Sequence, residues 1–421
     1  MSRIALLFPG QGSQYIGMSA KLYNEFEIAR QTFEEANDVL GFDLSKICFE
    51  GSLSELNQLE NMFAAILTSS MSSFRVYMQE IGITPHYAAG HSLGEYSALA
   101  CSGFMSFQDA LKIVYMRGKF VQESRLTHNG TMTVVNGVPS NILEDILKGI
   151  SNCSKTVCIA CYNAPEQYVI SGHHEAVMEA ENKLFELDAQ ITPMLLSPPL
   201  HSPLMEEAAS MLKAELKKYV YNCPQWPVIS NVTALPSTDV EGIVNNMVLQ
   251  MTRPVRWSET IEYLEKDGVT ITVEMGTQAV LSNLVKMHSN KFNTISLGQK
   301  GDIGSLLEIT ETNSSSTVES SRKNDAILFV SSCLAEAVCT QNKNHNKQEY
   351  EKGVIEPYER IEAILEELES NEAISGIEQM EEALANLRCI FFSKKLSSKE
   401  QNERLQRIFE KTKTHIAPLT S

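Results

Sequence analysis

The chain has 421 residues, of which 43% are hydrophobic and 21% are charged, so it has enough apolar side chains for a large core and global disorder is excluded. Lys and Arg number 35 against 52 Asp and Glu, which gives a formal net charge of −17. This charge argues against nucleic acid or an anionic membrane as general partners.

Targeting and redox signals are sparse. No uncharged apolar run approaches the roughly 18 to 20 residues of a membrane helix. Ile4–Phe8 runs straight into Pro9-Gly10 without a small-residue cleavage site, which predicts a buried strand and no signal peptide. The nine cysteines have no framework spacing. Cys158 and Cys161 lie in an expected strand and are interpreted as structural thiols, which fits a reducing cytoplasm.

Residues 1 to about 300 alternate short apolar runs with helical segments, which predicts an α/β unit. The expected strands include Ile4–Phe8, Tyr87–Ala89 and Thr270–Val273. Residues 1–125 and 198–300 would form the larger part.

Residues 126–197 differ from their surroundings. The pattern predicts strands at 131–135, 156–162 and 168–171, with helices at 141–147 and 174–187. This β-α-β-β-α order predicts a small ferredoxin-like subdomain inserted into the larger fold.

The C-terminal part has a different texture. We expect a linker at 301–323, where a Ser/Thr-rich stretch has no apolar period, followed by a helical extension at 324–421. Apolar stripes predict helices after Pro357, from Ile377 and after Ser397, the last with a capping box completed by Glu400. A bundle packed on itself is favoured over a docking appendage for a partner.

Gly90-His91-Ser92-Leu93-Gly94 follows an expected strand and opens a helical segment at Leu93–Cys101. A serine on such a tight strand-to-helix turn needs small neighbours and lies at the amide-rich start of the helix. The pattern occurs by chance in many proteins, so an inert serine stays open until a base is identified.

Nine histidines could supply that base. His91 adjoins the serine, and adjacent side chains diverge at a sharp turn, so we expect it to support the turn. His201 lies between Pro199 and Pro203, which restrict the backbone around the imidazole. No acidic residue nearby obviously completes a triad.

Phe8-Pro-Gly-Gln-Gly-Ser-Gln14 follows the first expected strand. Its glycines would let backbone amides approach a ligand closely. The Lys-Ser/Thr pair of a nucleotide-binding loop is missing, so an oxyanion-binding or anion-binding turn fits better.

Together these segments resemble the malonyl-CoA:acyl carrier protein transacylases over roughly residues 1 to 300. The resemblance rests on the order of the blocks Phe8–Gln14, Gly90–Leu99, Met116–Gly118, Asn163–Pro165 with Val169–Gly172, Leu200–Met205, Ser230–Val232 and Pro254–Trp257.

The resemblance implies an α/β-hydrolase-like large domain with a ferredoxin-like insert. Ser92 would be the nucleophile and His201 the general base, held by a backbone carbonyl at Gln250 in place of a carboxylate. The amides of Gln11 and Leu93 would form the oxyanion hole. The blocks also place His91, Asn163, Asn231 and Leu200 as supporting residues.

Arg117 would bind the free carboxylate of a malonyl group, because its planar fork matches a carboxylate bidentately. The implied reaction moves malonyl from coenzyme A through a Ser92 ester to the phosphopantetheine of an acyl carrier protein, with no cofactor and no metal. Leu200 stands where many malonyl-selective members carry Phe or Ser, which bears on discrimination against bulkier groups.

Extensions like the one after residue 323 are typical of stand-alone acyltransferases that serve polyketide synthases, which favours that pathway over fatty-acid synthesis. Alternatives are a proofreading hydrolase of the same fold, a non-catalytic interaction protein and a general esterase. Because carrier proteins and coenzyme A are acidic too, docking would need a basic patch, for which Arg253, Arg256 and Lys286 are candidates.

Overall fold

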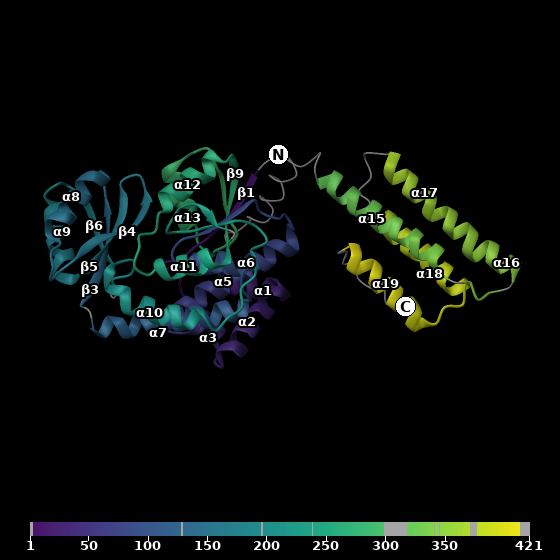
Figure 1. Ribbon diagram of the computed structural model, residues 1–421, viewed down its shortest axis with the longest axis horizontal. Coiled ribbons are helices and arrows are strands. Elements are labelled where there is room, and N and C mark those ends of the chain that lie inside the picture. Colours follow the sequence, from purple (N-terminus) through teal and green to yellow (C-terminus); the bar gives the residue numbers. More distant parts are fainter. Residues whose placement is uncertain are drawn as a thin grey trace. The chain divides into compact units, whose positions relative to one another are not determined.

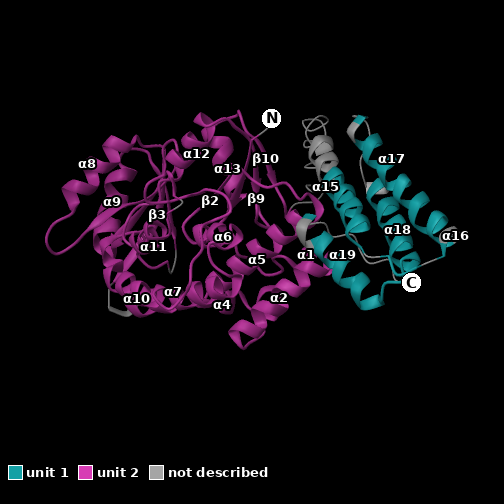
Figure 2. Cartoon of the chain, turned by 45° about the vertical axis from the view of Figure 1, so that its right-hand side comes forward, with its two compact units in different colours: residues 1, 308–421 teal, residues 2–307 magenta. Residues whose placement is uncertain are grey.

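The computed structural model describes residues 3–127, 129–194, 197–237, 239–298, 318–340, 342–344, 346–370 and 377–412. The chain forms two compact units, one of residues 2–307 and one of residue 1 with residues 308–421 (Figure 2). The larger unit contains two sheets, and the smaller unit is helical (Figure 1). Within the described residues, no helix is long and apolar enough to cross a membrane.

A six-stranded sheet organises the larger unit, in the order β10-β9-β1-β2-β7-β8. Its strands are β1 (Arg3–Phe8), β2 (Tyr87–Gly90), β7 (Val228–Ile229), β8 (Pro236–Ser237), β9 (Val269–Glu274) and β10 (Asn293–Ser296). All neighbours pair in parallel except β7 and β8. A parallel sheet is covered on both faces, which explains the continuous apolar runs expected for β1, β2 and β9.

Helices cover this sheet. They are α1 (Ala20–Glu25), α2 (Glu27–Leu40), α3 (Leu44–Glu50), α4 (Leu53–Leu56), α5 (Leu59–Glu80), α6 (Leu93–Cys101), α7 (Phe107–Thr127), η1 (Pro203–Met205), α10 (Glu206–Leu216), α11 (Val240–Leu249), α12 (Trp257–Lys266) and α13 (Val280–His288). Figures 1 and 2 show α12 and α13 on one side of the strands and α5 and α6 on the other. Helix α5 packs against α2, α6 and α7, so most of its surface is buried.

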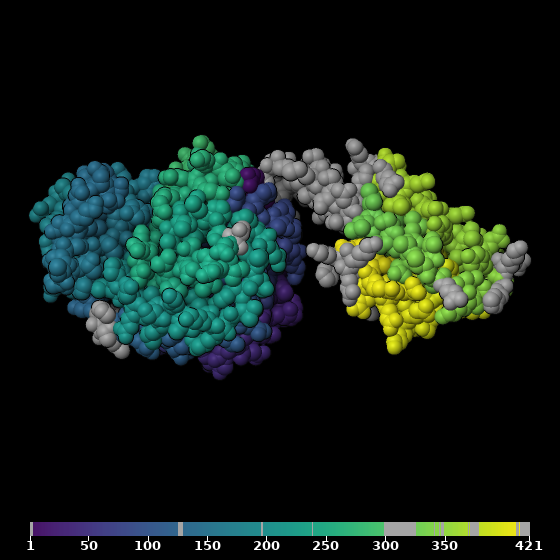
Figure 3. Space-filling model, in the orientation of Figure 1, coloured from purple at the N-terminus to yellow at the C-terminus, as the bar shows by residue number. Residues whose placement is uncertain are grey.

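A second sheet forms within residues 130–194. Its elements are β3 (Gly130–Asn136), α8 (Ser140–Ile150), β4 (Val157–Ala164), β5 (Gln167–His173), α9 (His174–Phe185) and β6 (Gln190–Met194). The strands pair antiparallel in the order β4-β5-β3-β6, and the residues form one continuous blue lobe of the larger unit in Figure 3. Strand β6 was not predicted, because it is an edge strand with mostly exposed residues and a proline, and so lacks the alternation of a half-buried strand.

Strand β4 also pairs, through an isolated parallel bridge between Cys161 and Val255, with the segment that precedes α12. The amide of Val255 donates to Ala160 O and the amide of Tyr162 donates to Val255 O. Cys158 and Cys161 lie on this strand as free thiols. Burial raises the pKa of Cys158 to about 11 and raises that of Cys161 further, so both remain protonated and unreactive, as expected for structural cysteines.

The helical unit contains α15 (Val318–Cys339), α16 (Lys347–Tyr350), the π-helical turn η2 (Glu351–Ile355), α17 (Glu356–Ser370), α18 (Ile377–Ser393) and α19 (Ser398–Thr412). Its own hydrophobic core includes Phe329, Ile361, Leu387 and Phe391, each fully buried. The predicted stripes after Pro357 and from Ile377 lie in α17 and α18, so the expectation of a bundle packed on itself agrees with this core.

The expected linker at 301–323 is partly wrong. Residues 301–317 lie outside the described residues, but 318–323 belong to α15. The buried face of α15 includes Ala326, Phe329 and Val330. Extending an established helix adds one hydrogen bond per residue, and serine is only modestly unfavourable there, so a segment without an apolar period can still belong to a helix.

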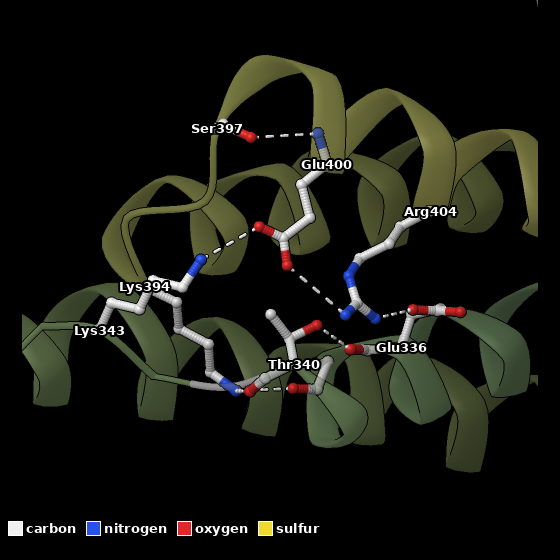
Figure 4. Close-up of polar contacts among 8 residues, drawn as sticks. Glu336, Thr340, Lys343, Lys394, Ser397, Glu400 and Arg404 are labelled. Carbon is white, nitrogen blue, oxygen red and sulfur yellow. Dashed lines mark hydrogen bonds and ion pairs between the residues drawn. The ribbon is translucent and has the colours of Figure 1, made fainter.

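Polar contacts tie α18 and α19 to the end of α15 (Figure 4). Lys394 is 6% exposed, and its Nζ donates to the carbonyls of Ala337 at 2.7 Å and Thr340 at 2.9 Å. The Glu400 amide donates to Ser397 Oγ at 3.3 Å, which is one half of the predicted capping box. The Glu400 carboxylate instead pairs with Lys343 and Arg404.

Replacing Lys394 with Ala should destabilise the helical unit by about 2 kcal/mol, because two buried carbonyls at a helix C-terminus lose their charged donor. Hydrogen exchange of α15 amides in the full chain measures this change. Lys399→Ala is the matched control, since Lys399 is exposed and, among the described residues, forms an ion pair only with Glu403, at 4.0 Å. A loss for Lys394→Ala no larger than that of the control contradicts the capping role.

Candidate active site

The nucleophile candidate lies on a strained turn between β2 and α6. Ser92 has φ 52° and ψ −109°, which is unfavourable for a residue with a side chain. Its amide donates to Asn231 Oδ1 at 2.7 Å, and Asn231 Nδ2 donates to Gly90 O at 2.6 Å. One asparagine therefore holds both sides of the turn.

Glycines permit this turn. A Cβ at Gly94 would lie 1.9 Å from the carbonyl oxygen of Phe8, and one at Gly90 would lie 2.0 Å from the Gly94 backbone. A Cβ at Gly10 would lie 2.3 Å from His91 O, so the Phe8–Gln14 loop passes directly against the turn. The loop therefore lies beside the start of α6. Gln11, the residue after Gly10, and Leu93, the residue after Ser92, are the two candidates for the oxyanion hole.

The base candidate, His201, lies beside Ser92 and is held from behind by a backbone carbonyl. Ser92 Oγ and His201 Nε2 are 2.7 Å apart, and His201 Nδ1 lies 2.7 Å from the backbone oxygen of Gln250. The Gln250 carbonyl can only accept a hydrogen bond, so Nδ1 carries the proton, and Nε2 is the unprotonated nitrogen that faces the Ser92 hydroxyl. His201 also has a positive φ of 57°.

His201 is 2% exposed, and burial together with the charge of Arg117 lowers its pKa to about 3. The imidazole is therefore neutral at physiological pH and able to accept a proton. His91 instead bonds Asn163 Oδ1 at 2.8 Å and contacts the Trp257 ring edge-on, so it braces the turn against β4, as expected.

Gln250 joins these parts. Its Nε2 donates to Ser92 O at 3.0 Å and to Glu95 Oε2 at 2.5 Å, and lies 3.3 Å from Asn231 Oδ1. Its Oε1 accepts a hydrogen bond from Arg117 Nη2 at 3.3 Å. Gln250 is fully buried, so both its backbone and its side chain serve the site.

Arg117 is also fully buried. Its guanidinium carbon lies over the rings of Phe63 and Tyr96, 5.0 and 5.1 Å from their centroids, and Nε lies 3.2 Å from Met251 Sδ. Nη1 is buried without a hydrogen-bond partner. A guanidinium with one unpaired buried nitrogen is suited to bind an incoming anion.

A cavity of about 220 Å³ opens onto Ser92 and His201. Its lining includes Met132 and Val169 of the second sheet and Leu281 and Leu284 of α13. Gln11, His91, Asn163 and Leu200 also line it. No group of three or more His, Cys, Asp or Glu side chains suited to a metal occurs in the part of the chain that the structure describes.

The three residues suggested for a basic docking patch, Arg253, Arg256 and Lys286, differ in how far their charges are already paired. Arg256 is engaged by Glu259 through two nitrogens. Arg253 and Lys286 are exposed and have no ion-pair partner among the described residues. Arg253 lines a second cavity, together with Lys148 and the far side of His201.

Known proteins are similar to this chain in sequence. A family model described as an acyl transferase domain matches residues 5–303. A malonyl CoA-acyl carrier protein transacylase of Bacillus subtilis is 37% identical over 401 residues, which cover 95% of this chain and 99% of that protein. The protein of that name from Escherichia coli K12 is 36% identical over 310 residues, 73% of this chain and 100% of its own length.

Solved structures of malonyl transacylases are also similar to this chain. A malonyl transacylase in complex with a type II polyketide synthase acyl carrier protein has a TM-score of 0.71 and 36% identity, and covers 73% of this chain and 100% of that one. The transacylase of Coxiella burnetii gives a TM-score of 0.71 and 34% identity, with coverage of 73% and 97%.

The fold and the matching acyl transferase domain define an acyltransferase of mixed α/β architecture. Within that class, the chain belongs to the family of malonyl-CoA:acyl carrier protein transacylases.

Sequence reasoning missed several residues of this site. Phe63, Tyr96 and Met251 contact Arg117 from three separate segments, and no motif marks them as a group. Glu95 was visible as the only charged residue of Leu93–Cys101. A carboxylate in an otherwise apolar or small-residue helix next to a nucleophile is the signal that could have identified it.

Gly94→Ala should destabilise the larger unit by roughly 3 kcal/mol or more, because the new methyl would overlap the Phe8 carbonyl and displace the turn. Urea unfolding and labelling of Ser92 by a fluorophosphonate both report the change. The control is Gly149→Ala in α8, where no atom lies within 4 Å of the added Cβ and a gain of about 0.5 to 1 kcal/mol is expected. Normal labelling and stability in Gly94→Ala contradict the packing argument.

Proposed function

We propose that this chain transfers a malonyl group from coenzyme A to an acyl carrier protein through an ester on Ser92. The observation that carries the proposal is the shared use of Gln250, whose carbonyl orients His201 while its side chain holds Arg117. Nucleophile, base and carboxylate-binding group thus occupy one buried network.

The reaction proceeds in two similar halves. His201 Nε2 takes the Ser92 proton while Oγ attacks the thioester carbonyl. The amides of Gln11 and Leu93 are our candidates to stabilise the oxyanion, and the collapse of the intermediate expels coenzyme A as a thiol protonated by His201. The phosphopantetheine thiol of the carrier then attacks the malonyl ester and regenerates the Ser92 hydroxyl. No cofactor is needed to balance these steps.

Arg117 would select the dicarboxylic acyl group. A malonyl carboxylate that reaches Nη1 gains a charge-assisted hydrogen bond at a nitrogen that is otherwise unpaired. An acetyl group leaves that nitrogen unpaired. Leu200 lines the same cavity, and its branched side chain would limit the space beside the acyl group.

Arg117→Ala should lower kcat/KM for malonyl-CoA by roughly 100-fold, the effect of losing a charged hydrogen bond in a buried site, and should change acetyl-CoA much less. Intact-protein mass spectrometry of Ser92 loading with each donor measures the ratio. Arg30→Ala is the matched control, because Arg30 is partly exposed and pairs with Glu27 on α2, away from the residues that line the cavity. Equal losses with both donors rule out the selective role.

The acceptor rests on the relatives, several of which are named as acyl carrier protein transacylases. Exposed Arg253 and Lys286 would supply positive charge for an acidic carrier. When the chain is incubated with malonyl-CoA and a phosphopantetheinylated carrier protein, the carrier should gain one malonyl group, and Ser92→Ala should abolish the transfer. Free malonate with an unloaded carrier would instead identify the proofreading hydrolase.

The finer architecture and setting are also proposals. We assign the part of the larger unit that contains the six-stranded sheet as α/β-hydrolase-like and residues 130–194 as ferredoxin-like. The helical unit is assigned as an extension of the larger, catalytic unit. The match to the Bacillus subtilis relative spans 95% of this chain and therefore includes most of the helical unit, whereas the Escherichia coli match spans 73%. The similarity to a malonyl transacylase solved with a type II polyketide synthase acyl carrier protein supports an enzyme serving a polyketide synthase. The nine free cysteines support a cytoplasmic setting.

A further inference from the structure

A buried carboxylate that the acyl-transfer steps leave unused lies beside the catalytic pair. Glu95 is three residues after Ser92 on α6 and is 3% exposed. Buried carboxylates are rare unless they are paired or hydrogen-bonded. The Glu95 side chain is hydrogen-bonded to residues that hold the reacting groups.

Two contacts define its position. Glu95 Oε2 accepts a hydrogen bond from Gln250 Nε2 at 2.5 Å and lies 3.3 Å from the backbone amide of Asn231. These contacts fix the orientation of the Gln250 side-chain amide. An ionised Glu95 can only accept a hydrogen bond, so it faces the NH₂ group of Gln250, and Arg117 can only donate, so it faces the amide oxygen. A reversed amide would set oxygen against carboxylate and nitrogen against guanidinium.

The charges around Glu95 are few. The elements packed against α6 are α5, α7, β1, β2 and β7, and the charged group that they direct at Glu95 is Arg117 on α7. The neighbouring titratable group on α6 itself is Tyr96, and the remaining contacts are the neutral Gln250, Asn231 and Ser230. Arg117 has no ion pair within 4 Å among the described residues. Its nearest negative charge is that of Glu95, and the Gln250 side-chain amide bridges the two groups by hydrogen bonds to both.

We propose that Glu95 is a positioning residue that supplies, through Gln250, the negative charge missing from the Ser92–His201 pair. It orients the amide whose own carbonyl holds His201, and it offsets the charge of Arg117 beside the imidazole. This inference rests on the proposed acyl transfer by Ser92.

The ionised form of Glu95 should favour reaction. As Ser92 attacks, His201 becomes an imidazolium beside the positive Arg117, and a nearby carboxylate stabilises that cation. Burial raises the pKa of Glu95 to about 7, while its hydrogen bonds and Arg117 oppose the rise. The pKa of His201 lies near 3, so the imidazole itself stays neutral over this range. Acylation should therefore accelerate as pH rises through about 7, when Glu95 loses its proton to solvent.

Single-turnover loading of Ser92 by malonyl-CoA between pH 5.5 and 8.5 tests this inference in the full chain. The wild-type rate should rise roughly tenfold with one inflection near pH 7, the effect of about one pKa unit on the base. Glu95→Gln keeps the shape of the side chain but removes the charge. Its rate should be independent of pH and roughly tenfold below that of the wild type at pH 8.5.

Two further variants separate charge from fold. Glu95→Asp keeps the charge and should restore an inflection, whereas Glu50→Gln removes an exposed carboxylate at the end of α3 and should match the wild type. A wild-type profile without the inflection, an inflection that persists in Glu95→Gln, or a flat profile in Glu95→Asp overturns the inference. The wild-type profile decides even if a variant fails to fold. Failure of the wild type to form any malonyl ester would instead refute the proposed function.

Discussion

The hydrogen bonds of one buried glutamine connect Ser92, His201, Glu95 and Arg117 in the candidate active site. Gln250 holds His201 through its carbonyl, and its side chain contacts Ser92, Glu95 and Arg117. Because the residue is fully buried, each of these polar contacts would be costly to lose. The turn at Ser92, the imidazole and the guanidinium are therefore positioned relative to one another by a single amino acid between α11 and α12.

This arrangement accounts for a catalytic pair without an adjacent acid. A backbone carbonyl is enough to select the His201 tautomer, but it adds no charge. Glu95 supplies charge one side chain further away, where it also balances Arg117. A carboxylate in direct contact with Arg117 would occupy the guanidinium and leave less of it for a substrate carboxylate. Separation by a neutral amide keeps Nη1 unpaired.

Features that depend on residues close together in the sequence could be predicted, whereas contacts between residues far apart in the sequence could not. Local periodicity placed β1, β2 and α6 to within about a residue, because strands and helices have sequence periods of their own. Edge strand β6 and the start of α15 were missed, since neither shows an apolar period. Gln250 and Arg117 entered only through family resemblance, because nothing in their local sequence marks a functional residue.

The sequence by itself determined the alternation of strands and helices, the glycine-bordered turn at Ser92 and the restricted backbone at His201. These features depend on residues close together in the chain, where backbone sterics and side-chain periodicity act directly. Only the tertiary structure decided that Arg117 lies over the rings of Phe63 and Tyr96 and that Glu95 meets Gln250, 155 residues away. Such contacts arise when parallel strands and their covering helices bring distant segments together, and no local pattern records which side chains then meet.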